Sequence, residues 1–220
     1  MLGIVEDDTF SRDTKLKGED MDYPIWDLAM GGGILMALVA IPHVIVAHFA
    51  VGGGLLIAVT ETLAVKRDDL ELRELARRSS LVLILVSTVF GAISGVGIWV
   101  VAGLISPAAI SSLIHTYVWG WAMEWVFFIL EIVAALVYYT TWDKISKGAH
   151  LLVGWLYFVG AYMSLVLING IITFVLTPGR WLETQAFWDG VFNPTSWPSL
   201  LLRAGIVVLM AAAWLAVTGV

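Results

Sequence analysis

The feature that most constrains this chain is a set of apolar runs, each long enough to cross a lipid bilayer. A helix crosses the hydrocarbon core, which is about 30 Å thick, in about 20 residues. Within residues 26–220, the runs that qualify cover about 42–65, 80–105, 117–142, 149–176 and 199–219. Only 14% of the residues are charged and 60% are hydrophobic, so a soluble fold would leave too much apolar surface in water. The sequence therefore predicts an all-α, polytopic membrane helix bundle with about five transmembrane helices.

The first apolar stretch is too long for a single perpendicular crossing, because it extends from about Ala29 to Val65. Pro42 lies within it, and proline removes a helical hydrogen-bond donor. We therefore expect an N-terminal interfacial helix over about 26–41, ahead of the first span. Residues 1–25 form an acidic N-terminal tail that lacks the apolar core of a signal peptide.

Basic residues in the connections predict the orientation of the bundle. The first and third loops carry Lys66, Arg67, Arg73, Arg77, Arg78, Lys144 and Lys147. The second loop has no Lys or Arg, and the fourth has only Arg180. The positive-inside rule then places the first and third loops in the cytoplasm and the N-terminus outside.

The chain contains no cysteine, which excludes several kinds of redox site. Disulfides, thiolate metal sites, iron–sulfur clusters and covalently attached c-type haem all require cysteine from the chain that holds them. The net charge of −6 argues against nucleic acid as a partner.

Two histidines stand in the first span, in the segment IPHVIVAHFAVGGG. His43 and His48 are five residues apart, so they lie roughly 140° apart around a helix and cannot face one haem. Neutral imidazole is a common ligand of haem iron, although each histidine could equally be a hydrogen-bonded packing residue. The glycines at 52–54 leave room for a flat macrocycle or for a neighbouring helix.

Four further ionisable residues lie in or at the edge of spans, where charge is costly and often functional. Glu124 and Glu131 are seven residues apart and share a helix face, so they suit a proton relay or a pair of structural acids. Glu61 either reaches the cytoplasmic interface or lies at a proton entry. Arg203 either extends to the outer interface or pairs with a haem propionate. In the second span Ser87, Gly91 and Gly95 form a small-residue stripe that is typical of helix packing.

Three stretches resemble the N-terminal half of cytochrome bd quinol oxidase subunit I. They read LMALVAIPHVIVAHFAVGGGLLIAVTETL, AMEWVFFILEIVAALVYYTTWDKI and HLLVGWLYFVGAYMSLVLING. The resemblance implies that His43 corresponds to the family's ligand of a high-spin haem on the outer side. It also implies that Glu131 corresponds to an acid that serves proton delivery. In the same alignment, the matching positions include Glu61-Thr62, Trp142-Asp143, His150 and Asn169-Gly170.

Several positions depart from the family pattern. The family's histidine ligand for the low-spin haem falls near Leu202 or Arg203, where this sequence has no histidine. His48 stands where the family has no ligand, and Glu124 is displaced by about one residue from the family's first acid. The sequence ends before the family's quinol-binding loop and its later haem ligands. We therefore expect a half-sized relative that is incomplete on its own as an oxidoreductase.

The resemblance implies a haem-b-binding subunit of a respiratory electron-transfer complex, with one or more haems and a quinol or quinone. Its location would be a prokaryotic plasma (inner) membrane, with the N-terminus in the periplasm. Its partners would be further membrane subunits, with a c-type cytochrome or an iron–sulfur protein as candidates. A haem-free membrane anchor that keeps the fold and a proton-coupled transporter remain the alternatives.

Overall fold

The computed structural model describes residues 25–218, and all the regular structure in this part of the chain is helical. The long helices are α2 (Gly32–Arg67), α6 (Val118–Thr140), α7 (Lys147–Leu176), α10 (Ser196–Thr218) and a composite helix over Leu70–Ile105. Each is long and apolar enough to cross a membrane. This confirms the predicted all-α bundle with five spans. The acidic N-terminal tail lies almost wholly outside the described residues.

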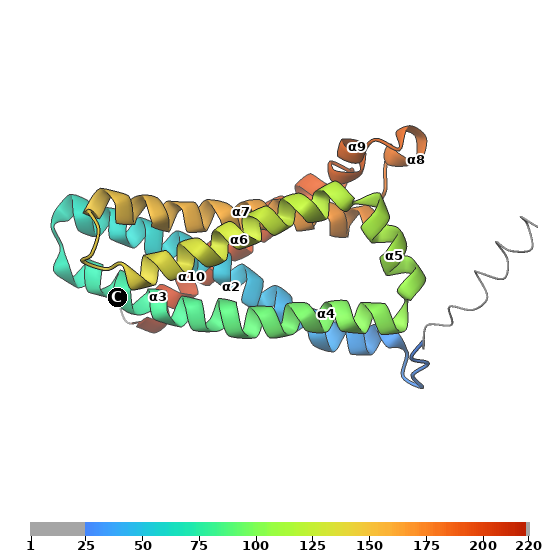
Figure 1. Ribbon diagram of the computed structural model, residues 1–220, viewed down its shortest axis with the longest axis horizontal. Coiled ribbons are helices and arrows are strands. Elements are labelled where there is room, and N and C mark those ends of the chain that lie inside the picture. The colour runs from blue at the N-terminus through green and yellow to red at the C-terminus, as the bar shows by residue number, and fades with distance from the viewer. Residues whose placement is uncertain (1–24, 219–220) are drawn as a thin grey trace, which may run out of the picture.

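The long helices run side by side along one axis (Figure 1). The α2–α3 connection at Asp68 and Asp69 and the α6–α7 connection at 141–146 lie at one end. We call this end the basic end, because these connections and the adjoining helix ends carry the basic residues described above. The short helices α5 (Pro107–Thr116), α8 (Trp181–Thr184) and α9 (Phe187–Val191) lie at the opposite end.

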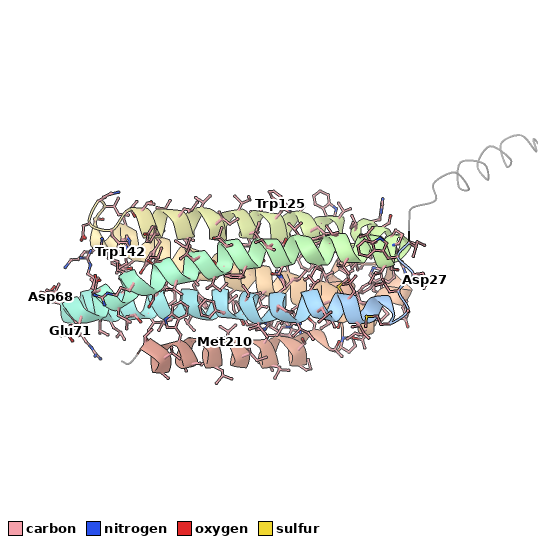
Figure 2. All side chains as sticks on the ribbon, turned by 90° about the horizontal axis from the view of Figure 1, so that it is seen from below. Asp27, Asp68, Glu71, Trp125, Trp142 and Met210 are labelled. Atoms are coloured by element: carbon pink, nitrogen blue, oxygen red, sulfur yellow. The ribbon has the colours of Figure 1, made fainter. Side chains whose placement is uncertain are left out.

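Helix α2 is the central element, since it packs against α3, α4, α7 and α10. Figure 2 shows α10, marked by Met210, on the side of α2 away from α6, which is marked by Trp125. A core cluster that includes Ile57, Leu83, Tyr138 and Trp214 joins α2 to α3, α6 and α10. The surface of the bundle is largely apolar, as expected for a protein surrounded by lipid.

The division of the first apolar stretch at Pro42 was wrong, because α2 continues through this proline as one helix of 36 residues. At 1.5 Å per residue α2 is about 54 Å long, well beyond the thickness of the hydrocarbon core. Proline is tolerated within membrane helices because neighbouring groups and local adjustments satisfy the backbone. The stretch over 26–41 therefore contributes the first turns of the span from Gly32 onward, and the described residues ahead of it, 25–31, form no separate helix.

The second span has a change of helix type in its middle. Helix α3 (Leu70–Ile84) is capped by Asp69, whose carboxylate accepts hydrogen bonds from the amides of Glu71 and Leu72. The π-helix η1 (Leu85–Gly91) follows, and α4 (Ala92–Ile105) completes the span. Gly91 and Gly95 lie against α2 near Val46 and His43, which supports a packing role for these two glycines.

Candidate functional site

His43 presents one ring nitrogen to α4 and keeps the other available. Its Nδ1 lies 3.0 Å from the Ser94 hydroxyl. That hydroxyl already donates its single proton to the Phe90 carbonyl at 2.5 Å, so Ser94 accepts a hydrogen bond from Nδ1–H. His43 Nε2 then carries a lone pair, and it has no hydrogen-bond partner among the described residues. Fixing one nitrogen by a hydrogen bond while the other stays unprotonated is the arrangement of metal-ligating histidines.

His48 lies on a different face of α2, as the five-residue spacing predicts. Its Nδ1–H donates to the Val44 carbonyl at 2.7 Å, and its Nε2 is buried without a partner in the part of the chain that the structure describes. The side chain lies within electrostatic range of Arg203 on α10. His43 and His48 therefore face separate surroundings, and one planar group cannot bind both.

Arg203 of α10 lies beside a buried polar cluster that links α10 to α7. Its Nε lies 3.4 Å from the Ser199 hydroxyl, which donates to Asn169 on α7 at 2.6 Å. The Asn169 amide in turn donates to the Ser196 carbonyl at 3.0 Å. This part of the bundle thus offers a cation near His48 that is held partly inside the protein.

The space beside the three consecutive glycines of α2, at 52–54, is occupied by side chains and backbone of neighbouring helices. A Cβ added at Gly52 would lie 2.5 Å from the Val207 carbonyl oxygen of α10. Additions at Gly53 and Gly54 would meet Leu83 and Tyr157. These glycines therefore make room for neighbouring helices, and of the two roles predicted from the sequence the structure supports this one.

Glu124 and Glu131 both face α7, as their seven-residue spacing predicts. The Ser164 hydroxyl donates to Glu124 at 2.9 Å, and the Tyr157 hydroxyl lies 3.3 Å from Glu131. A cavity of about 50 Å³ adjoins Glu131 and Tyr157 and is also lined by Ser87. Its polar lining comes from Ser87, Thr88, Glu131 and Tyr157, and the rest of the lining is apolar. The volume is large enough for water, since each molecule requires roughly 10–15 Å³ by this measure.

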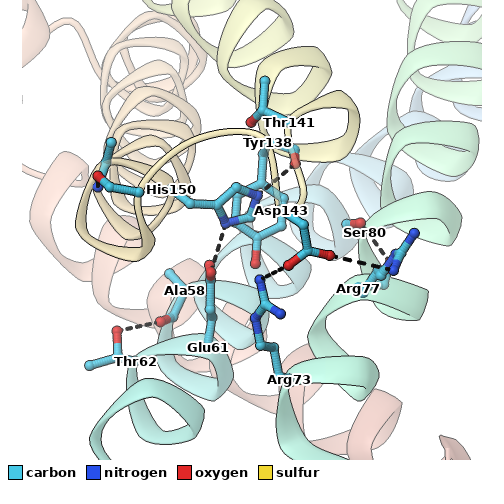
Figure 3. Close-up of polar contacts among 12 residues, drawn as sticks. Ala58, Glu61, Thr62, Arg73, Arg77, Ser80, Tyr138, Thr141, Asp143 and His150 are labelled. Carbon is cyan, nitrogen blue, oxygen red and sulfur yellow. Dashed lines mark hydrogen bonds and ion pairs between the residues drawn. The ribbon is translucent and has the colours of Figure 1, made fainter. Parts of the chain in front are cut away.

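Glu61 is buried in the protein near the basic end. Its carboxylate is 2.7 Å from Nδ1 of His150, and both side chains are at most 4% exposed (Figure 3). His150 Nε2 lies 2.9 Å from the backbone carbonyl of Tyr138. Because both ring nitrogens are engaged, His150 has no lone pair to offer a metal ion, whereas His43 and His48 do.

The pairing of Glu61 with His150 could not be predicted from the sequence, because 89 residues separate them. Tyr157 was also missed as the partner of Glu131. A signal was present in the spacing of polar residues along α7, since His150, Tyr157 and Ser164 recur every seven residues. No group of three or more His, Asp or Glu side chains within residues 25–218 could hold a metal ion by itself. This leaves single histidine ligands as the candidate metal-binding residues.

Comparison with known proteins supports the resemblance seen in the sequence. The solved structure of bd oxidase from Geobacillus thermodenitrificans matches with a TM-score of 0.71 and 23% identity. The match covers 82% of this chain and 42% of that one, so the chain spans less than half the length of the solved subunit. No curated protein matches the sequence. Residues 33–220 match the family described as cytochrome bd terminal oxidase subunit I, and the chain therefore belongs to this family.

Proposed function

We propose that this chain is a haem-b-binding membrane subunit of a respiratory oxidoreductase complex. The observation that carries the proposal is His43, whose Nδ1–H is fixed by Ser94 while Nε2 keeps its lone pair. The residues thus fit the cofactor that membership of the bd oxidase family implies. Bound haem would supply one-electron transfer between a quinol and a partner redox protein or oxygen.

His43 is the proposed axial ligand. Ser94 orients the imidazole and keeps it in the tautomer that binds iron, a role typical of groups behind a metal ligand. His48 and Arg203 are proposed to serve a second haem at the α2–α10 surface, His48 through Nε2 and Arg203 through a propionate.

Glu124 and Glu131 are proposed to carry protons during turnover. Both carboxylates lie inside the bundle with a hydroxyl partner on α7, and Glu131 adjoins a cavity that can hold water. Glu61 is proposed to belong to the same relay from its position near the basic end. By the positive-inside rule this end faces the cytoplasm, which places the N-terminus of the chain in the periplasm.

Further membrane subunits are proposed to complete the complex. Helix α4 has Val101 as its one buried residue, and Ile93, Val96 and Trp99 are each more than 40% exposed. In the apolar part of the composite helix over Leu70–Ile105, only 6% of the residues are buried, compared with 33% for α7. This face is therefore available to a partner that contributes further haem ligands or a quinone site.

Haem content of the purified complex tests the proposal. His43→Ala should lose a Soret-absorbing haem by the pyridine haemochrome assay. His115→Ala should keep wild-type content, because His115 lies exposed on α5 and its Nδ1–H bonds the Ser111 carbonyl. Equal haem in both variants would refute the ligand assignment. A complex that contains no haem would favour the haem-free anchor.

A further inference from the structure

Polar side chains form a regular series along the contact between α6 and α7. Three positions on α6, each seven residues apart, face three on the antiparallel α7 with the same spacing. The pairs are Glu124 with Ser164, Glu131 with Tyr157, and the Tyr138 backbone with His150. Successive pairs are about 10.5 Å apart along the helix axes. The last pair lies nearest the basic end, where Glu61 of α2 joins it.

We propose that Glu61 and His150 form a proton-loading site that supplies this series. The inference rests on the proposed relay through Glu131 and adds its point of entry and a residue, His150, not assigned to it above.

The hydrogen bonds of His150 define how many protons the pair holds. The Tyr138 carbonyl can only accept, so His150 Nε2 carries a proton. One further proton occupies the 2.7 Å contact between Nδ1 and Glu61 Oε1. It resides either on the carboxyl group, opposite a neutral imidazole, or on the imidazole, opposite a carboxylate. Transfer of this proton inward leaves a carboxylate and a neutral imidazole, and uptake of one proton restores the pair.

The pair adjoins a polar cavity at the basic end through which a proton can arrive. This cavity has a volume of about 210 Å³ and is lined by Leu70, Arg73, Glu74, Arg77, Trp142 and Asp143. The Trp142 ring lies 4.3 Å from the His150 ring, centre to centre. Arg73 bonds Asp143 at 2.7 Å (Figure 3). Arg73 and Trp142 line the cavity, and Arg73 Nε and Trp142 Nε1 are buried without partners in residues 25–218.

On the side of the pair away from the basic end, two polar atoms lack hydrogen-bond partners. Glu61 Oε2 and the Tyr138 hydroxyl are buried and have no partner within the described chain. The next polar group on the side of α7 that faces α6 is Tyr157, beside the 50 Å³ cavity and Glu131. One seven-residue step is too long for a direct hydrogen bond, so the transfer runs through water in this region. The titratable and charged groups around the pair are Arg73 and Arg77 on α3, Tyr138 on α6 and Asp143 in the α6–α7 connection.

A purely structural pair, which only ties α2 to α7, makes a different prediction from a proton-loading site. Glu61→Gln keeps the shape and can donate an amide N–H to His150 Nδ1, but it has no acidic proton to pass on. We expect Glu61→Gln to keep the melting temperature and haem content of the purified complex while its quinol-driven turnover falls roughly tenfold or more. Thr62→Val is the matched control, since Thr62 is the next residue on α2 and bonds the Ala58 carbonyl; it should turn over normally.

The same preparation distinguishes the two proposals. If Glu131→Gln turns over at the wild-type rate, the relay itself is refuted. If Glu131→Gln is slow while Glu61→Gln turns over normally, the relay stands and the loading site is overturned. A Glu61→Gln variant that loses as much stability as Glu61→Ala would show a structural tie and also overturn the inference.

Wild-type protein gives a test that needs no variant of the pair to fold. With ¹⁵N-labelled histidine, the His150 Nδ1 proton should exchange with water at least as fast as the complex turns over. Slower exchange would show that the pair cannot supply the protons. His150→Gly should be slow, and added imidazole, which can refill the site, should restore its rate; failure of rescue in a folded, haem-loaded variant would count against a proton-carrying role.

Discussion

Gly52→Ala tests the conclusion that the glycines of α2 make room for a helix. The added Cβ would lie 2.5 Å from the Val207 carbonyl oxygen and 3.2 Å from the Ala211 amide nitrogen. Both belong to the α10 backbone, so no side-chain rotation relieves the contact. The first distance must open to at least 3.4 Å before it becomes an ordinary contact. Helix α10 must therefore move away from α2 along part of its length.

The cost follows from two opposing effects. Forcing an extra carbon into a packed interface costs about 1–3 kcal/mol, and the upper end applies because the obstacle is backbone. Alanine is favoured over glycine within a helix by about 1 kcal/mol. The net loss is about 2 kcal/mol, which lowers the melting temperature of a chain of this size by roughly 4–8 °C.

Gly205→Ala is the matched control, because it lies on α10 and a Cβ there meets nothing within 4 Å. It should keep or slightly raise the melting temperature. Thermal unfolding in mild detergent, followed by circular dichroism, measures both variants. If Gly52→Ala has the same melting temperature as Gly205→Ala, the conclusion that Gly52 makes room for α10 is refuted. If it loses haem without any loss of melting temperature, the glycine makes room for the macrocycle.

Three further predictions concern the acids and the assembly. Glu131→Gln should keep the fold and the haem but lower the turnover of the complex roughly tenfold. Glu131→Ala should also lose stability, because it leaves a cavity and an unpaired neighbour. Normal turnover of Glu131→Gln would identify Glu131 as a structural acid. The hydrogen bond and charge of Arg73 lower the pKa of Asp143, so this stabilisation is complete above the unfolded value near pH 4 and is lost as pH falls through the lowered pKa. Wild type should therefore melt above Asp143→Asn at about pH 7 and converge with it at about pH 2; a constant difference would contradict this. Finally, the native protein should co-purify with at least one more membrane subunit, and a stable, haem-loaded, active monomer would refute that expectation.

The spans could be predicted from the sequence because bilayer thickness sets the length of an apolar run. Pro42 could not be interpreted correctly from the same run. Its effect depends on whether the surrounding helices satisfy the backbone, and this information is not local. The loops were also read as simple connections, whereas α5, α8 and α9 shape the end opposite the basic end.

The candidate site was predictable as far as single helices determine it. The separate faces of His43 and His48, and the shared face of Glu124 and Glu131, follow from helical periodicity. The Glu61–His150 contact joins α2 to α7. Predicting it would have required knowing how these two helices are rotated relative to each other. Matching the seven-residue spacing on α7 to that on α6 could have indicated Tyr157 as a partner of Glu131, because antiparallel neighbours with equal spacing stay in register.

The π-helix over Leu85–Gly91 explains why one stripe of small residues serves two sites. Ser87, Gly91 and Gly95 have the four-residue spacing of a single α-helical face, yet Ser87 lines the cavity beside Glu131 while the glycines pack on α2. Wider turns change the direction of every side chain beyond them. The segment therefore gives the two halves of the span different facing directions, so that α3 and α4 meet different neighbours although the sequence is one apolar run.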